Sequence, residues 1–165
     1  MAYRVAIITL SDSGAKGLRK DRSGPVIRDM VIEAGYEVVS QQILSDEPQE
    51  LIDALTDICD NRRAQLVLTT GGTGFSRRDN APEATLAVIE RNVPGIAEAM
   101  RARSLQITPR AMLSRGVSGI RGYTLIVNLP GSPKAARENL EAILPALDHG
   151  IGILVGDEKE CGGTP

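Results

Sequence analysis

Short apolar runs alternate along this chain with longer stretches in which apolar residues recur at helical spacing, and this alternation most constrains its fold. Strands are predicted over residues 4–9, 36–43, 65–70, 116–121 and 123–128, the last two forming a hairpin. Residues 4–9, 65–70 and 124–128 are the apolar runs, which are typical of buried strands. The stretches between them predict helices over residues 23–34, 48–60, 81–91 and 94–106 and from 133 to about 147. Strands that alternate with helices of about ten residues or more predict a three-layer α/β sandwich, in which helices flank a mostly parallel sheet that also carries a short β-hairpin.

The predicted strands end close to polar, glycine-rich or acidic segments. Residues 10–22, 44–47, 71–80 and 129–132 each follow a strand directly. In an open parallel sheet, ligands bind at the carboxyl ends of the strands, where the topology switches. We therefore expect these segments to meet at one edge of the sheet and to form the ligand site.

The segment TTGGTGFSRRDNAPEAT, residues 69–85, combines glycines with the start of a predicted helix. Glycines let a backbone approach a ligand closely, and successive N–H groups can then hold an anion. Asn80 and Glu83 have capping-box spacing, so the N-terminus of the following helix would point at the same edge. A plain strand-to-helix turn without a ligand has the same glycine pattern and stays open at this point.

Two acidic positions follow strands, and each has two interpretations. Asp79 comes after Arg77 and Arg78 and either holds Mg²⁺ beside a phosphate or caps the next helix. Asp46, with Glu47, lies at another strand end and either joins the first acid or stabilises the start of the helix that follows. Ser132 and Pro133 predict a further helix N-terminus beside this edge.

Several function classes are disfavoured. No Gly-Lys-Ser/Thr occurs, and no Gly-x-Gly-x-x-Gly follows a strand, so neither a P-loop nor a dinucleotide fingerprint is present. A single histidine and two distant cysteines, Cys59 and Cys161, argue against zinc sites and disulfides. The net charge of −2 and the scarcity of aromatic residues predict no nucleic-acid partner. No apolar run reaches about 18 residues, so we expect no membrane association and a cytoplasmic protein.

The chain carries no evident nucleophile with a base to activate it. What recurs at the strand ends is anion-binding backbone, arginine and carboxylate. This set suits phosphoryl or nucleotidyl transfer, in which catalysis consists mostly of positioning and charge stabilisation. We expect one domain over residues 1–155 and a polar tail over residues 156–165.

Four motifs together resemble a known family. These are residues 69–85, LSRGVSGIRGYTLIVNLPGSPKAA (113–136), SDSGAKGLRKDRSGP (11–25) and the acids of ILSDEP (43–48). They closely resemble the molybdopterin adenylyltransferases of molybdenum-cofactor biosynthesis, the MogA/MoaB family, and the N-terminal domain of gephyrin. The resemblance covers residues 3–150 and identifies the domain of residues 1–155 as a MogA/MoaB-like molybdopterin-binding domain.

The resemblance implies roles for particular residues. The two catalytic acids would be Asp46 and Asp79, with Asp79 at the metal. The residues implied to bind the nucleotide are Gly71, Gly72, Thr73, Gly74, Asn128, Pro130 and Gly131. Those implied to bind the pterin are Ser114, Arg115 and Gly116, with Ser13, Asp21 and Ser23 from the first loop.

The resemblance also implies a reaction and partners. Molybdopterin would be adenylylated by Mg-ATP with release of pyrophosphate, so ATP and molybdopterin would be substrates and Mg²⁺ the cofactor. A homotrimer or a larger assembly is expected, with the molybdate-insertion enzyme of the pathway as a further partner. The alternative is a non-enzymatic protein of the same fold that binds or carries molybdopterin.

Overall fold

A computed structural model of the protein describes residues 2–157. Most of the predicted tail over residues 156–165, including Cys161, therefore lies outside the described residues. Six strands form one sheet: β1 (Arg4–Leu10), β2 (Glu37–Leu44), β3 (Leu66–Thr70), β4 (Arg91–Asn92), β5 (Ser118–Arg121) and β6 (Thr124–Leu129). Their order is β2-β1-β3-β6-β5-β4, with the first four parallel and the last two antiparallel to their neighbours.

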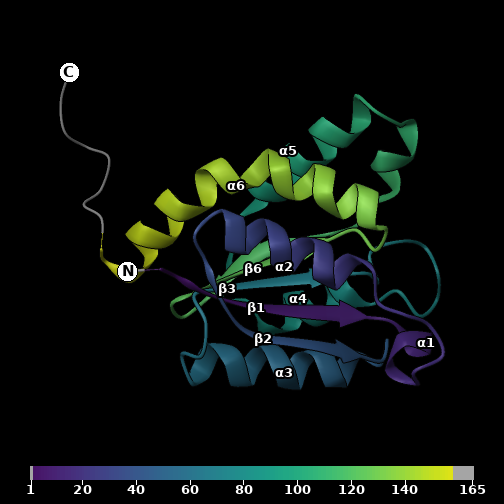
Figure 1. The fold of residues 1–165 in the computed structure, drawn as a ribbon, viewed down its shortest axis with the longest axis horizontal. Coiled ribbons are helices and arrows are strands. Elements are labelled where there is room, and N and C mark those ends of the chain that lie inside the picture. Colours follow the sequence, from purple (N-terminus) through teal and green to yellow (C-terminus); the bar gives the residue numbers. More distant parts are fainter. Residues whose placement is uncertain (1, 158–165) are drawn as a thin grey trace.

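Helices cover both faces of this sheet (Figure 1). One face carries α2 (Ser23–Glu33), α5 (Pro94–Leu105) and α6 (Pro133–Val155), and the other carries α3 (Pro48–Asp60) and α4 (Ala81–Val88). The short α1 (Asp12–Ala15) and the 3₁₀ helix η1 (Pro109–Leu113) lie in connections. The three-layer α/β fold with a mostly parallel sheet and a hairpin is confirmed.

The core divides into two layers because β1, β3 and β6 are covered on both faces. Ile7, Leu68 and Val127 point towards α2, α5 and α6, while Ile8 and Val67 point towards α3 and α4. All five side chains are fully buried. This explains why the central strands read as continuous apolar runs rather than as alternating ones.

Two predicted helix ends are wrong. The helix predicted to reach residue 91 ends at Val88, because Arg91 and Asn92 pair with β5 as the short edge strand β4. The last helix contains Pro145 and continues past Leu147 to Val155. Its buried residues Leu147 and Ile151 extend the apolar face, so tertiary packing outweighs the hydrogen bond that a proline removes.

The topology switches between β1 and β3. From β1 the chain first moves outward to β2 and then returns to the opposite side of β1 to form β3. Gly71 directly follows β3 and has a φ of +95°, and a Cβ built on it would lie 2.5 Å from the carbonyl oxygen of Leu10. Only glycine lets the two strand ends approach this closely.

We expect Gly71→Ala to lower the free energy of unfolding by about 2–4 kcal/mol, since alanine adds left-handed backbone strain and a clash with β1. Urea denaturation measures the change. Gly95→Ala is the matched control, because a Cβ there meets no atom within 4 Å in the first turn of α5. Equal stability of the two variants would show that the close approach at Gly71 is not a constraint.

Candidate functional site

The segments that follow β1, β2, β3 and β6 meet at the carboxyl edge of the sheet, as predicted (Figure 1). The amide of Ser11 donates to the carbonyl of Leu44 at 2.9 Å, which joins the ends of β1 and β2. The Thr70 hydroxyl donates to the carbonyl of Pro130 at 2.7 Å, which joins the ends of β3 and β6. These bonds turn four sequence-distant segments into one surface.

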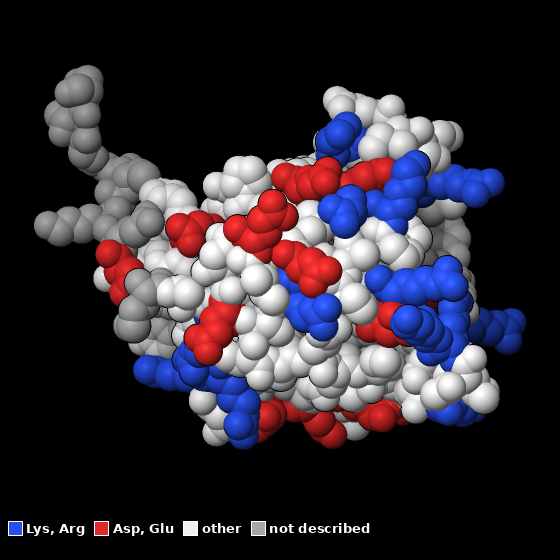
Figure 2. Space-filling view, viewed as in Figure 1, with Lys and Arg blue, Asp and Glu red and all other residues white. Residues whose placement is uncertain are grey.

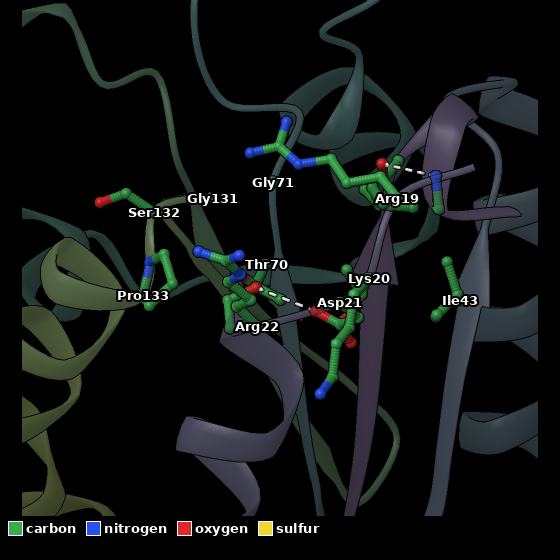
Figure 3. Close-up of a pocket in the computed structure, with 15 residues that line it drawn as sticks. Arg19, Lys20, Asp21, Arg22, Ile43, Thr70, Gly71, Gly131, Ser132 and Pro133 are labelled. Carbon is green, nitrogen blue, oxygen red and sulfur yellow. Dashed lines mark hydrogen bonds between the residues drawn. The ribbon is translucent and has the colours of Figure 1, made fainter. Parts of the chain in front are cut away.

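A cleft of about 400 Å³ opens between the first loop, the end of β3 and the start of α6 (Figure 3). Arg19, Lys20 and Arg22 line it from the first loop, and Gly71 and Gly131 line it from the strand ends. Lys and Arg side chains gather on this side of the molecule, towards which the central strands point (Figure 2). The first cleft is therefore suited to an anion although the chain as a whole is slightly acidic.

Main-chain groups add to this positive character. Helix α6 begins at the cleft, where the Ser132 hydroxyl accepts a hydrogen bond from the amide of Ala135 at 3.1 Å, so the predicted N-cap is confirmed. Within residues 2–157, the amides of Gly72, Thr73 and Gly74 donate no hydrogen bond. Unpaired amides beside a helix N-terminus bind phosphate oxygens well.

Asp21 holds the first loop in shape. Its carboxylate accepts hydrogen bonds from the Thr9 hydroxyl at 2.8 Å, the Gly24 amide at 3.1 Å and the Ser23 hydroxyl at 3.4 Å. It thus accepts a hydrogen bond from the first turn of α2 and ties the first loop to β1. Ser13 lies on α1, with its hydroxyl 3.3 Å from that of Ser11. Of the three first-loop residues expected at the pterin, Asp21 and Ser23 line the first cleft.

Asp79 closes the turn that follows the glycines. Its carboxylate accepts a hydrogen bond from the Ser76 amide at 3.0 Å, and its own amide donates to the Ser76 carbonyl at 2.9 Å. A Cβ on Gly74 would lie 2.9 Å from this carboxylate, so a larger residue there would displace the Asp79 side chain. The predicted capping box is wrong: the Asn80 side chain makes no cap bond, and Glu83 pairs with Arg115.

Arg115 braces the glycine segment from the other side. Its amide donates to the Thr73 carbonyl at 2.9 Å. Its guanidinium donates to the carbonyls of Gly74 at 2.8 Å and Asp79 at 2.7 Å and pairs with Glu83. Because the guanidinium is occupied by groups of the protein itself, Arg115 supports the glycine segment in this structure.

We expect Arg115→Lys to lower the free energy of unfolding by about 2 kcal/mol, because an ammonium group cannot replace the forked set of hydrogen bonds. The variant should also increase hydrogen exchange of residues 73–80. Arg137→Lys is a control on α6, where the exposed side chain forms no ion pair with any described residue. Unchanged exchange in Arg115→Lys would contradict the bracing role.

A second cleft of about 270 Å³ lies on the far side of the glycine segment and has mostly apolar walls. Thr73, Gly74 and Pro130 line it together with Ser114. The expected nucleotide residues are thus divided, since Gly71 and Gly131 line the first cleft. The expected pterin residues are divided as well, since Asp21 and Ser23 line the first cleft and Ser114 lines the second. We call residues 71–74 and 130–131, which lie between the two clefts, the ridge.

Asn128 and Gly116 lie beneath this ridge. Asn128 is 1% exposed, and its amide group donates to the hydroxyls of Thr69 at 2.9 Å and Thr85 at 3.0 Å and accepts from Val117. Gly116 is buried, and a Cβ on it would lie 3.2 Å from the Asn128 carbonyl. Both residues support the site through the core.

The two predicted acids lie close enough for their charges to interact. Burial raises the pKa of Asp46, and the negative charges of Asp12 and Asp79 raise it further. The amide of Asp12 donates to the Asp46 carboxylate at 3.0 Å, and the amide of Asp46 donates to the Asp12 carboxylate at 2.9 Å. The sequence interpretation did not assign a role to Asp12, although its place after β1 put it at the same edge.

Arg78 completes this acidic corner. Its guanidinium donates to both carboxylate oxygens of Asp12, at 2.9 and 3.0 Å, and to Glu47 at 3.2 Å. This pairing lowers the pKa of Asp12 to about 2. Arg77, the neighbouring residue, forms no ion pair with any of residues 2–157.

The pKa of Asp12 gives a pH dependence of stability. Because the folded-state pKa lies below the ordinary value of 3.8, the ionised group stabilises the fold above pH 3.8. That contribution is lost as the pH falls from 3.8 towards about 2. We therefore expect Asp12→Asn to reduce the slope of unfolding free energy against pH in this window, measured by urea denaturation. Parallel slopes for both proteins would contradict the pairing in solution.

The donor set fits Mg²⁺ only if the substrate supplies further ligands. Among residues 2–157, no three His, Cys, Asp or Glu side chains group as a metal site. Asp46 and Asp79 supply two carboxylates, and Mg²⁺ is usually bound by one or two carboxylates together with substrate phosphates. The residues present therefore fit a metal that arrives with a polyphosphate. No helix within the described residues is long and apolar enough to cross a membrane.

The fold and site define a class: an α/β protein whose strand ends carry a cleft lined by cationic side chains. Residues 6–149 match the family described as "Probable molybdopterin binding domain". A molybdopterin adenylyltransferase from Helicobacter pylori is 39% identical over 93% of this chain and 88% of its own length. The chain belongs to this molybdopterin-binding family.

Solved structures agree with this assignment. The molybdopterin biosynthesis enzyme MoaB from Thermus thermophilus is 47% identical, with a TM-score of 0.89 over 93% of this chain and 97% of that one. The tungsten cofactor synthesizing protein MoaB from Pyrococcus furiosus is 33% identical, with a TM-score of 0.84 over 93% of this chain and 97% of that one.

Proposed function

We propose that this protein is a molybdopterin adenylyltransferase, a nucleotidyltransferase of molybdenum-cofactor biosynthesis. The observation that carries the proposal is the meeting, at one sheet edge, of unpaired main-chain amides and cationic side chains with Asp46 and Asp79. Relatives named molybdopterin adenylyltransferase support an enzyme rather than a passive carrier.

In the proposed reaction the terminal phosphate of molybdopterin attacks the α-phosphorus of ATP. A new P–O bond forms there, and the bond from the α-phosphorus to the bridging oxygen breaks. The electron pair of that bond leaves with pyrophosphate. The nucleophile belongs to the substrate, which accounts for a site without a Ser, Cys or His nucleophile.

The protein contributes position and charge. The phosphates bind across the ridge between the two clefts, where the amides of Gly72, Thr73 and Gly74 and the N-terminus of α6 meet them. Arg19 and Arg22, which extend from the first loop into the first cleft, neutralise part of the negative charge of the phosphates. Such preorganised donors are the usual main source of rate enhancement in phosphate chemistry.

Each cleft leaves room for one of the organic groups. Arg115 donates to the Gly74 carbonyl and Asn128 to the Thr69 hydroxyl, so both contact the protein beneath the ridge. We therefore assign them supporting roles in nucleotide and pterin binding. Ser114 and Pro130 face the more apolar second cleft, which suits a flat ring system. Asp21 and Ser23 face the first cleft.

Asp46 and Asp79 would hold Mg²⁺ together with the substrate phosphates. When bound, this ion offsets the charge of the triphosphate and of the departing pyrophosphate. We also propose that the protein is cytoplasmic, forms a homotrimer or a larger assembly and delivers its product to the molybdate-insertion enzyme of the pathway.

We expect Asp79→Asn to lower kcat for adenylylation by about two orders of magnitude or more, as removal of a transition-state electrostatic contact does. Its free energy of unfolding should change by no more than about 1 kcal/mol, since asparagine retains an acceptor for the Ser76 amide. Pyrophosphate release from molybdopterin, ATP and Mg²⁺ measures the rate.

Asp57→Asn is the control, because Asp57 pairs with Arg63 at the opposite edge of the sheet. Tight binding of molybdopterin by the unsubstituted protein without pyrophosphate release would instead support a carrier. Loss of folding in Asp79→Asn, with normal turnover of the folded fraction, would assign Asp79 a structural role only.

A further inference from the structure

We propose that Arg78 and Asp12 are positioning residues that hold Asp46 in place for the reaction. Arg78 comes from the segment after β3, Asp12 from that after β1, and Asp46 from that after β2. The three residues form one chain of contacts across the switch point. The chain of contacts is independent of the proposed function, and only the role of Asp46 towards the substrate rests on it.

The contact between Arg78 and Asp12 is a fork. The guanidinium Nε and Nη2 each donate to a different oxygen of the Asp12 carboxylate, at 3.0 and 2.9 Å. The side chains are 51% and 37% exposed, so water screens their attraction and the pair adds little stability. What the fork supplies is orientation, because two parallel hydrogen bonds fix the plane of the carboxylate.

Asp12 passes this orientation on to Asp46. Each residue donates its amide to the carboxylate of the other, at 3.0 and 2.9 Å. A rotation of the Asp12 side chain therefore breaks the bond from the Asp46 amide and moves the backbone that carries Asp46. Arg78 also donates to Glu47 at 3.2 Å, so the segment after β2 is held at two successive residues.

The charge at this corner makes a cation necessary. The charges of Asp12 and Asp79 both act on the carboxylate of Asp46, and Glu47 adds a fourth carboxylate. Arg78 contacts two of the four directly. Without its guanidinium the carboxylates would repel one another, and the segments after β1 and β2 would lose the side-chain bridge between Asp12 and Glu47.

Hydrogen exchange of the unliganded protein tests the contact chain without any assay of activity. In Arg78→Gln we expect the amides of Asp12 and Asp46 to exchange severalfold faster, because the carboxylates that accept them are no longer oriented. Arg78→Lys should lie between Arg78→Gln and the unsubstituted protein, since lysine keeps the charge and loses the fork. Arg77→Gln removes the same charge one residue away and should leave both amides unchanged.

Turnover tests whether the chain acts through Asp46. We expect Arg78→Gln to lower kcat by about one to two orders of magnitude, the scale of a misplaced catalytic group, with a smaller change in KM for ATP. In an Asp46→Asn background the same substitution should cause no further loss, because the residue that it positions is already missing. Circular dichroism confirms that the compared variants are folded.

The outcomes separate the two proposals. Unchanged exchange at Asp12 and Asp46 in Arg78→Gln would overturn the positioning role whatever the activity. An additive loss of turnover in the double variant would show that Arg78 acts independently of Asp46 and would overturn it as well. Faster exchange in a protein that never releases pyrophosphate would support the contact chain and reject the proposed reaction.

Discussion

The close approach of three strand ends is the constraint on which the rest of the structure depends. Gly71 follows β3, and a Cβ on it would meet the last carbonyl of β1 at 2.5 Å. Gly131 follows β6, and a Cβ on it would lie 3.2 Å from the Cα of Gly71. Without these glycines the segments would be spread apart by the width of their side chains. With them, the segments after β1, β3 and β6 lie side by side, and the amides of Gly72, Thr73 and Gly74 are not used in hydrogen bonds within residues 2–157.

The residues at this edge divide into those that face the clefts and those that hold them. Arg19, Gly131 and Ser132 line the first cleft, whereas Arg115 and Asn128 use their polar groups on the protein itself. A buried amide with all its hydrogen bonds satisfied is rigid, and a forked guanidinium holds backbone carbonyls in fixed directions. This rigid backing lets a short glycine segment keep its amides preorganised, which glycines by themselves would not do.

Much of the fold and part of the site could be predicted from the sequence. The order of strands and helices follows from the apolar periodicity, and the convergence of the four segments follows from the rule for parallel sheets. The ends of two helices could not be predicted from local sequence. The conformation of the residues after Val88 depends on pairing with β5, and that of the residues after Leu147 depends on core packing. The role of Arg115 could not be predicted from the sequence either. The motif around it implies that it contacts a ligand, whereas in the folded chain its guanidinium contacts the carbonyls of Gly74 and Asp79. Asp12 lacked a local signal, since its partners lie on two other segments.

The acidic corner explains how one site can hold both anions and a cation. In the proposed function, phosphates would bind at the first cleft and at the glycine amides, while the carboxylates lie to one side and are partly neutralised by Arg78. Burial and neighbouring charges raise the pKa of Asp46, which means that its ionised form is held at unfavourable electrostatic energy. In the proposed function, a divalent cation would lower that energy, and a polyphosphate that brings such a cation would gain from both halves of the site. We therefore expect a metal-bound triphosphate to bind more tightly than free phosphate or free metal.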